Sequence, residues 1–385
     1  MKFEFSFMRL ITDNDVTASF GLAADECLAA RIGAGERRDV ACNVPTLRLY
    51  TYRSHCALVG RFQNLENEVH RAYCVDHNIA LNRRPTGGGA IIMGNDQLGV
   101  ALTIPGSDDD SYSRARELMT QFSSGVVHGL QSLGVAASFR RKNDIEVNGR
   151  KIVGLGIYRA PKGGLLFHAS LLVGVDIPFM LRVLKTPFEK ISDKEIDTVA
   201  DRVTTVRREI GREITVDEVR ARVAEGYAAT FGVSLNGGGF TDEECHAISD
   251  LQSLKYDTAE WVNQTTAVPD AQGSAKIKTP NGLIDVRLTL AGNTIKAIMI
   301  GGDFFAAEGA VADLESSLRW HSADPKAVVA TLESVYAKRA NDLASLPFDP
   351  LTQTIQQAIR RARVAESASR ADPYGCFVTP EGAHV

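Results

Sequence analysis

Two arginines that run into three glycines are the residues of this chain best suited to binding an anion. The run Arg83-Arg84-Pro85-Thr86-Gly87-Gly88-Gly89 is followed by the apolar residues 90–92. Glycines let the backbone approach a ligand closely, and exposed N–H groups in such a loop bind anions. Arg84 adds a planar fork that matches a carboxylate or a phosphate. The loop therefore predicts a site for an anionic small molecule, and a nucleotide is the anion we expect.

The glycine triplet also has a simpler interpretation, which is a hairpin turn or bulge with surface arginines beside it. Two well-known phosphate-binding motifs do not fit it. A Walker loop would continue with Gly-Lys-Ser or Gly-Lys-Thr, and a dinucleotide fingerprint would space its glycines differently. The function must therefore be argued together with other parts of the chain.

A lysine on a predicted hairpin is the second candidate for chemistry. Asn148-Gly149 separates two alternating runs, which favours a two-residue type I′ turn. In that register Glu146 faces Lys151 and Asp144 faces Val153. Asp144, Glu146 and Lys151 then share one face of the hairpin. The alternative is a surface lysine that pairs with Glu146 and contributes little to stability.

The bulk properties limit the classes of protein. The chain has 385 residues, which is enough for two or three domains, and a formal net charge of -4, which argues against a general nucleic-acid binder. No apolar run is long enough to span a bilayer, and the first residues do not resemble a signal peptide. None of the six cysteines forms a Cys-x-x-Cys pair, so we expect neither a zinc knuckle nor a thioredoxin motif. We expect a cytoplasmic protein that binds neither nucleic acid nor membranes.

The pattern of apolar residues predicts an α/β (α+β) protein with two folded parts. A helix over 66–78 and a long amphipathic helix over 111–133 are expected among the strands of the first part. Gly237-Gly238-Gly239 predicts a linker, and Thr241 with Glu244 resembles a helix capping box. The expected organisation is a catalytic domain over 1–240, a linker or connecting helix over 241–274, an accessory domain over 275–345, and a C-terminal helix and tail over 346–385.

Six motifs in order resemble those of the lipoate–protein ligases. They are Leu22-Ala23-Ala24-Asp25-Glu26, Gly60-Arg61-Phe62-Gln63-Asn64, the run 83–90, Asn143-Asp144-Ile145 with Gly149-Arg150-Lys151-Ile152-Val153-Gly154, His168-Ala169-Ser170-Leu171-Leu172, and Arg202-Val203-Thr204-Thr205. The segment Gly302-Asp303-Phe304-Phe305 resembles that family's accessory C-terminal domain. The resemblance covers roughly residues 10–345.

The resemblance implies a mixed-sheet catalytic fold of the biotin and lipoate ligase type, with a small α/β accessory domain. It also implies a two-step reaction. Lipoate, or octanoate, reacts with ATP and Mg²⁺ to give acyl-AMP and pyrophosphate, and a lysine of an acceptor protein then takes the acyl group and releases AMP. The expected acceptor is a lipoyl domain, a glycine-cleavage H-like protein or another lipoate-binding protein.

The resemblance also implies roles for individual residues. Lys151 matches the family's invariant catalytic lysine, which would hold the carboxyl and α-phosphate oxygens. Asp144 could in addition hold Mg²⁺. The residues implied in binding ATP and the lipoyl-adenylate are Arg84, Thr86, Gly87, Gly88, Gly89, Ala90, Ile91, Asn143, Asp144, Arg159 and His168. Many of these ligases carry His where this chain has Met93, and a thioether cannot donate a hydrogen bond as imidazole does.

Three rival functions remain open. An octanoyl or lipoyl transferase of the same fold would need no ATP, and several such enzymes use a cysteine nucleophile. Cys376 is the cysteine with a suitable polar setting, but it lies far along the chain from the core motifs. A biotin ligase fits the Lys151 hairpin less well. A non-catalytic binder of lipoylated partners would not need both Arg84 and Lys151. The sequence leaves lipoate and octanoate undistinguished.

Overall fold

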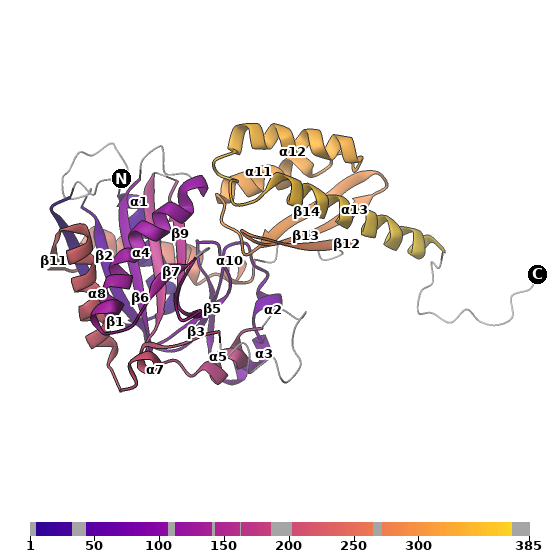
Figure 1. Cartoon of the computed structure of the whole chain (residues 1–385). Helices are drawn as coiled ribbons and strands as arrows, with labels where there is room; N and C mark the ends of the chain where they lie inside the picture. The colour runs from indigo at the N-terminus through magenta and orange to yellow at the C-terminus, as the bar shows by residue number, and fades with distance from the viewer. Residues whose placement is uncertain are drawn as a thin grey trace, which may run out of the picture. The chain divides into compact units, whose positions relative to one another are not determined.

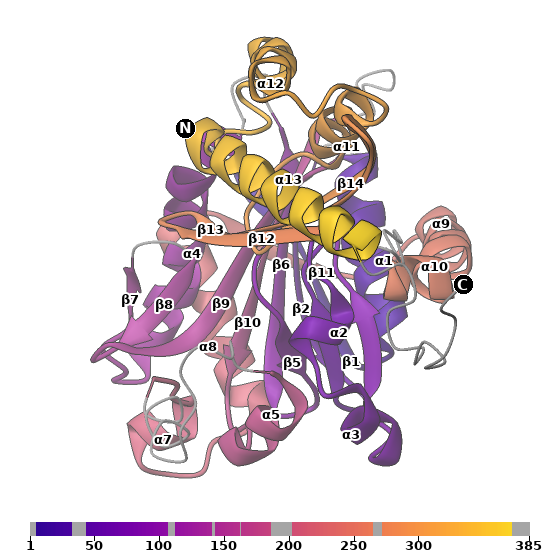
Figure 2. The same ribbon diagram turned by 90° about the vertical axis from the view of Figure 1, so that its right-hand side faces the viewer.

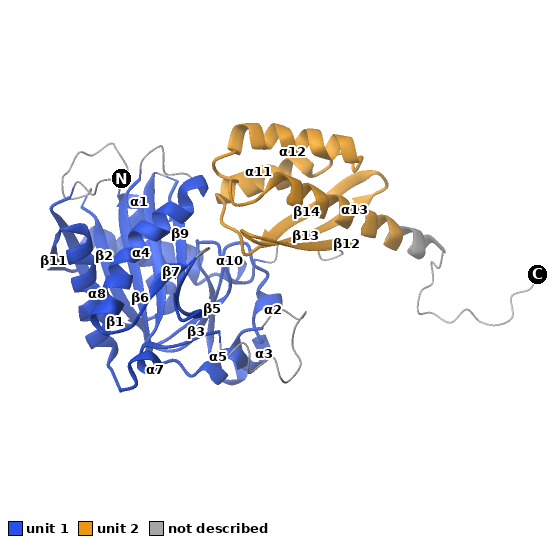
Figure 3. Ribbon diagram, in the orientation of Figure 1, with its two compact units in different colours: residues 1–265 blue, residues 266–385 orange. Residues whose placement is uncertain are grey.

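A computed structural model describes residues 5–32, 44–106, 112–140, 143–161, 163–185, 202–264 and 272–371, and the side chains of that last range up to residue 365. The chain divides into two compact units, residues 1–265 and residues 266–385 (Figure 3). Cys376 and the tail 372–385 lie outside the described residues. No described helix is both long and apolar enough to cross a membrane.

A mixed sheet of eight strands forms the centre of the first unit as described (Figure 1). Its order is β11-β1-β2-β6-β10-β9-β8-β7, with β1 parallel to both of its neighbours and the other pairs antiparallel. The strands are β1 Phe7–Val16, β2 Thr46–Tyr52, β6 Gln97–Pro105, β7 Ser138–Arg140, β8 Asp144–Val147, β9 Arg150–Arg159, β10 Gly164–Leu172 and β11 Ser234–Gly238.

Two neighbouring residues of β10 show that helices cover both faces of this sheet. Leu166 belongs to a cluster with Leu22 and Cys27 of α1, Ala18–Arg31. The ring of Phe167 lies 6.0 Å from that of Phe122 of α4, Ala115–Ser132. Successive strand residues point to opposite faces. Helix α1 therefore covers one face, while α4 covers the other together with its neighbour α8, Val216–Phe231.

A second, three-stranded sheet lies beside the first. Its order is β4-β3-β5, with β3 Cys56–Val59, β4 Ala80–Arg83 and β5 Ile91–Met93. The glycine run connects β4 to β5. The helix expected over 66–78 is instead two short helices, α2 Leu65–Glu68 and α3 Arg71–Asp76. The break occurs because Val69 pairs with Leu184, next to α5 Ile177–Val183, so its backbone is extended.

Residues 241–264, named the connector below, pack within the first unit. They form α9 Asp242–Leu251, the π-helix Gln252–Tyr256 and α10 Ala259–Asn263. The capping box of Thr241 and Glu244 is confirmed, because each side chain accepts a hydrogen bond from the other residue's backbone N–H. The linker expected at Gly237–Gly239 is wrong for its first two residues. They belong to β11, where pairing with β1 supplies the hydrogen bonds of an edge strand.

The second unit is an antiparallel sheet of β12 Gly273–Thr279, β13 Gly282–Ala291 and β14 Thr294–Gly302, followed by three helices. These are α11 Glu308–Leu318, α12 Pro325–Arg339 and α13 Phe348–Ala371. Figure 2 shows α13 lying across the strands of this sheet. A Cβ on Gly273 of β12 would lie 2.1 Å from the carbonyl oxygen of Ala358 in α13, so only glycine lets this helix pack so closely on the strand. The fold class, mixed α/β with a small α/β unit, is confirmed.

We expect Gly226→Ala to destabilise the first unit by about 2 to 4 kcal/mol. A Cβ on Gly226 of α8 would lie 2.3 Å from the carbonyl oxygen of Gly125 in α4, so the two helices would have to separate. The free energy of unfolding in urea measures the effect. Gly239→Ala is the control, since nothing lies near its Cβ, and should change stability by less than about 0.5 kcal/mol. Equal stability of the two variants would contradict this packing.

Candidate active site

A pocket of about 550 Å³, open to solvent, lies on the α1 face of the large sheet. His168 and Ser170 of β10 line it from one side, and Leu58 and Ile91 of the small sheet line it from the other. The full lining is Leu22, Tyr50, Tyr52, Leu58, Arg84, Gly89, Ala90, Ile91, Met93, Asn143, Lys151, Gly154, Leu155, His168, Ala169 and Ser170.

The pocket brings together residues that are far apart in the sequence. Seven of the residues implied by the family resemblance line it: Arg84, Gly89, Ala90, Ile91, Asn143, Lys151 and His168. Thr86, Gly87, Gly88, Asp144 and Arg159 are not in its lining. Thr86 and Asp144 contact lining side chains, whereas Arg159 is at the far end of β9, where it pairs with Leu165. The glycines of the loop therefore have different surroundings. Gly89 lines the pocket, whereas the carbonyl of Gly88 packs against Gly60.

The backbone of Lys151 is held from two sides. On one side Glu146 of β8 faces Lys151, as predicted. On the other, the Lys151 N–H donates to the carbonyl of Arg202 at 2.8 Å, and the Thr204 N–H donates to the carbonyl of Lys151 at 2.9 Å. The Arg202–Thr205 motif is thus a short parallel neighbour of the lysine strand.

The hairpin before Lys151 differs from the predicted register by one residue. Asn148 and Gly149 both have positive φ, 50° and 80°, which confirms the type I′ turn. A β-bulge then makes Asp144 face Gly154 and not Val153. A β-bulge inserts one extra residue into one strand, here β9, and this changes the direction of nearby side chains. The expectation that Asp144 and Lys151 share a face is nevertheless confirmed by their contact.

The side chain of Lys151 forms an ion pair with Asp144, with 2.6 Å between Nζ and the carboxylate oxygen. The alternative partner, Glu146, instead pairs with Arg140 at 2.5 Å. A Cβ on Gly154 would lie 3.1 Å from Lys151 Nζ, so the glycine gives the ammonium its room. Both members of the pair are about a third to a quarter exposed, so a ligand can reach the ammonium.

Arg84 is buried beneath the glycine loop and holds its shape. Its guanidinium donates to the carbonyls of Leu58 at 2.9 Å, Gly87 at 3.2 Å and Gly89 at 2.5 Å, and to Thr86 Oγ1 at 3.1 Å. Burial lowers the pKa of Arg84 to about 10, so it stays charged at neutral pH. The positive charge therefore lies directly behind the loop residues that line the pocket.

His168 is a neutral member of the same hydrogen-bonded chain. Its Nε2 lies 2.9 Å from Thr86 Oγ1, which already accepts from Arg84. Burial, and secondarily the charge of Arg84, lower the pKa of His168 from 6.5 to about 3. A Cβ on Gly156 would lie 2.3 Å from that Nε2, so the strand opposite must carry glycine. A neutral imidazole in the pocket can accept or donate a hydrogen bond without adding charge.

The apolar end of the pocket was not predicted from the sequence. Leu22, Tyr50, Tyr52, Leu58 and Met93 form this wall and belong to one buried cluster. The Met93 thioether accepts a hydrogen bond from the hydroxyl of Ser170 in β10 at 2.8 Å. The hydroxyl of Tyr52 is buried with no hydrogen-bond partner among the described residues.

A buried ionic network fixes this apolar wall. Arg48 is fully buried and pairs with Asp13 at 2.6 Å and with Asp25 at 2.8 Å. It also lies 4.1 Å from the centre of the Tyr50 ring, whose hydroxyl donates to Asp25 at 3.2 Å. Burial raises the pKa of Asp25, against the opposing effect of Arg48. The acidic end of the Leu22–Glu26 motif thus orients one tyrosine of the pocket.

The comparison with known protein families identifies the class of protein. Residues 17–228 match the lipoyl protein ligase A/B catalytic domain, and residues 269–345 match the bacterial lipoate protein ligase C-terminus. The first match covers more than half of the chain. The chain belongs to the lipoyl protein ligase A/B family, and the resemblance inferred from the six motifs is confirmed.

Relatives of two named activities are similar to this chain. Lipoate–protein ligase 1 of Staphylococcus aureus is 28% identical, over 81% of this chain and 89% of that protein. The octanoyltransferase LipM of Clostridioides difficile is also 28% identical, over 66% of this chain and 97% of that protein.

Two solved structures share the fold. One is the bi-partite lipoate protein ligase of Thermoplasma acidophilum, studied with its E2 lipoyl domain, which is 28% identical with a TM-score of 0.60, over 68% of this chain and 98% of that one. The other is a lipoate-protein ligase A bound with ATP, which is 26% identical with a TM-score of 0.57, over 67% of this chain and 98% of that one.

We expect His168 to stay neutral down to about pH 4, with its proton on Nδ1. Thr86 Oγ1 accepts from Arg84, so its own hydrogen is directed at Nε2. Nitrogen-15 NMR of the imidazole reports both the tautomer and the pKa. Because the folded pKa lies below the unfolded value, this group lowers stability as the pH falls from about 6.5 toward 3. An ordinary titration near pH 6.5 would contradict the prediction.

We expect Tyr52→Phe to leave the free energy of unfolding unchanged or to raise it by up to about 1 kcal/mol. The substitution removes a buried hydroxyl that has no partner among the described residues. Tyr50→Phe is the matched control, because it removes the donor to buried Asp25 and should cost about 1 to 3 kcal/mol. Chemical denaturation of both variants makes the comparison. A larger loss for Tyr52→Phe than for Tyr50→Phe would contradict it.

Proposed function

We propose that the chain is an ATP-dependent lipoate–protein ligase. It would join lipoate or octanoate to AMP with release of pyrophosphate, and then transfer the acyl group to a lysine of an acceptor protein. The observation that carries this proposal is a pocket that is apolar at Leu22, Tyr50 and Tyr52 and has the ammonium of Lys151 in its lining. A medium-length acyl acid complements both features, because its chain is apolar and its carboxylate end is anionic.

The proposal assigns each end of the pocket a task. The acyl chain lies along the apolar wall, and its carboxylate meets Lys151 and the glycine loop. The carboxylate oxygen attacks the α-phosphorus of ATP, and the bond to the pyrophosphate leaving group breaks. Lys151 and the loop, with the charge of Arg84 behind it, offset the negative charge that gathers as two anions meet. His168, being neutral, adds a hydrogen bond at the same place.

The second step follows from the same geometry. The amine of the acceptor lysine attacks the carbonyl carbon of the acyl-adenylate, an amide bond forms, and AMP leaves with the electrons of the broken C–O bond. Lys151 stabilises the oxygen that becomes negative in this step. Asp144 lies 2.6 Å from the Lys151 ammonium and so orients it beside the pocket.

Magnesium would be held mostly by the nucleotide. The described residues contain no group of three or more His, Cys, Asp or Glu side chains that could bind a metal. Mg²⁺ is commonly held by one or two carboxylates together with substrate phosphates. Asp144 fits this mode as a carboxylate that contacts the pocket residue Lys151, and the ion would then neutralise phosphate charge.

Two observations favour a ligase over a cysteine-dependent transferase. No cysteine is among the described residues that line the pocket. Cys56 and Cys74 are buried, and burial raises the pKa of each thiol, which disfavours the reactive thiolate. ATP use is supported by the fold shared with a lipoate-protein ligase A bound with ATP. A lipoyl domain is the acceptor we propose, by analogy with the Thermoplasma enzyme and its E2 lipoyl domain.

We expect the wild-type protein to form acyl-AMP and pyrophosphate from ATP, Mg²⁺ and lipoate without any acceptor. Lys151→Ala should lower that rate by at least about 100-fold, because it removes the positive charge in the pocket. Pyrophosphate release and mass spectrometry of the bound adenylate measure it. Lys278→Ala, a substitution of an exposed lysine in the second unit, is the control and should leave the rate unchanged.

The transferase is the second candidate, since the chain is as similar to LipM as to the ligase of S. aureus. If the wild type formed no adenylate but moved octanoyl groups between carrier proteins without ATP, the transferase would replace the ligase. Loss of activity in Lys278→Ala equal to that in Lys151→Ala would remove the special role of Lys151.

A further inference from the structure

We propose that the connector, residues 241–264, supports the binding site from outside the pocket, and that Trp261 is a positioning residue for the glycine loop. Trp261 acts by holding Arg83, the residue that precedes Arg84 at the start of that loop. The inference rests on the proposed function only in naming the ligand, an acyl acid with ATP. Neither family match includes this segment, since the first ends at residue 228 and the second begins at residue 269.

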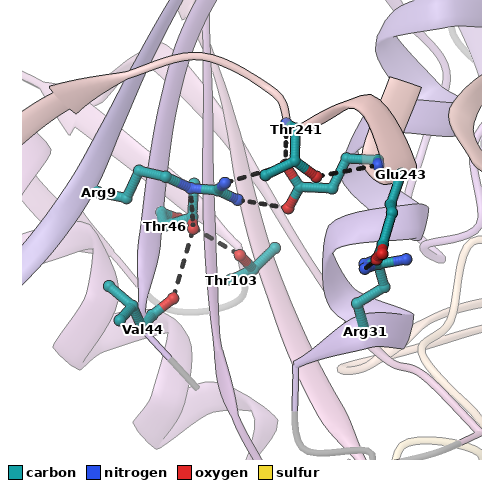
Figure 4. Close-up of polar contacts among 8 residues, drawn as sticks. Arg9, Arg31, Val44, Thr46, Thr103, Thr241 and Glu243 are labelled. Atoms are coloured by element: carbon teal, nitrogen blue, oxygen red, sulfur yellow. Dashed lines mark hydrogen bonds and ion pairs between the residues drawn. The ribbon is translucent and has the colours of Figure 1, made fainter. Parts of the chain in front are cut away.

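The connector is first attached to the large sheet at its N-terminal end. Arg9 of β1 forms a bidentate pair with Glu244, at 2.8 and 2.9 Å, within the capping box of α9 (Figure 4). Glu243, the residue before it in the same turn, pairs with Arg31 of α1 at 2.9 Å (Figure 4). The Arg9 and Glu244 side chains are mostly buried, so this attachment is more than a surface ion pair.

The middle of the connector is attached to α1 and β4. Lys255 lies 2.8 Å from both carboxylate oxygens of Glu26, and the hydroxyl of Tyr256 donates to the same carboxylate. The Asn82 side chain donates to the carbonyl of Tyr256 at 2.9 Å. Because Asn82 lies in β4, the connector already contacts the strand that leads into the glycine loop.

Trp261 and Arg83 then bind each other reciprocally. The indole N–H of Trp261 donates to the carbonyl of Arg83 at 2.8 Å. The guanidinium of Arg83 donates back to the carbonyls of Trp261 at 3.1 Å and Val262 at 3.3 Å. The Trp261 ring also lies 4.0 Å from the ammonium of Lys255 and 4.9 Å from the guanidinium of Arg61, measured to the ring centre. Cations at such distances from an indole are attracted to it.

Arg83 extends this attachment to the turn below the loop. Its guanidinium donates to the carbonyls of Gly60 at 2.9 Å, Arg61 at 3.2 Å and Gln63 at 2.7 Å. That turn meets the loop directly. The Arg61 N–H donates to the carbonyl of Thr86 at 2.9 Å, and a Cβ on Gly60 would lie 2.1 Å from the Gly88 carbonyl oxygen. The Arg83 side chain thus joins the connector to the turn, and the turn contacts the loop through its backbone.

The charge of Arg83 explains why the connector is needed. The residue is fully buried, and its five hydrogen-bond acceptors are all carbonyls. A buried cation without a carboxylate partner is tolerated only while its donors are satisfied. Two of the five acceptors come from the connector. Displacing it would leave a buried cation partly unpaired beside Arg84, and the loop would have to rearrange to hydrate it.

The test compares Trp261→Phe with Trp320→Phe, which changes the one other tryptophan of the chain. Phenylalanine keeps a ring at 261 but removes the donor to the Arg83 carbonyl. We expect Trp261→Phe to speed amide hydrogen exchange in residues 84–93 by about fivefold or more, and to raise KM for lipoate and ATP by a similar factor. The kcat for adenylate formation should stay within about twofold, because Lys151 is held separately by β8 and residues 202–204. Trp320, exposed in the second unit, should give no change.

The outcomes separate this inference from the proposed function. Hydrogen exchange is measured without ligand, so it tests the contact between Trp261 and the loop even if the wild type forms no adenylate. Exchange in residues 84–93 that is equal in the two variants overturns the proposal. Faster exchange with unchanged KM also overturns it, because the connector would then support the loop without affecting binding. A fall in kcat and in the active fraction with unchanged KM would indicate general destabilisation and would overturn it as well.

Discussion

The burial of two adjacent positive charges is the constraint on which the rest of the site depends. Arg83 and Arg84 both donate to backbone carbonyls, and neither pairs with a carboxylate in the part of the chain that the structure describes. Each carbonyl must therefore be in place, which fixes the turn at 60–63, the glycine loop and the end of the connector together. The cost of burying the charges is visible in lowered pKa values for both groups, with Arg83 at about 9. The gain is a positive potential behind an otherwise uncharged loop.

The pocket is assembled from two halves that are held by different forces. The half with the glycine loop depends on those arginines and on long-range side-chain contacts. The half with Lys151 depends on backbone pairing, on the bulge in β9 and on Gly154 and Gly156, which leave space for Lys151 and His168. The two halves meet at the hydrogen bond between Thr86 Oγ1 and His168 Nε2 and at the bond from the Ser170 hydroxyl to the Met93 thioether.

The sequence predicted the features that depend on neighbouring residues. Asn148-Gly149 predicted the type I′ turn, and Thr241 with Glu244 predicted the capping box. The glycine run predicted the loop. Each of these features depends on residues that are close together in the sequence. The pairing of Lys151 with residues 202–204 was missed because those residues lie some fifty positions further along the chain. The roles of Tyr52, Met93 and Trp261 depend on the fold in the same way. Gly237 and Gly238 have a linker composition, yet β1 pairs with them as a strand.

Hydrogen bonds on both edges of the lysine strand leave its backbone little freedom. Lys151 is paired to β8 on one edge and to residues 202–204 on the other, so its main chain cannot slide without breaking bonds on both. The ammonium can then move only by rotation of its four-carbon side chain, away from Asp144. In the proposed reaction, this rotation lets the same lysine follow the reacting group from carboxylate to phosphate to carbonyl. A fixed backbone with a flexible lysine side chain can contact a reacting group at successive positions. A guanidinium held rigidly by several hydrogen bonds, like that of Arg84, could not.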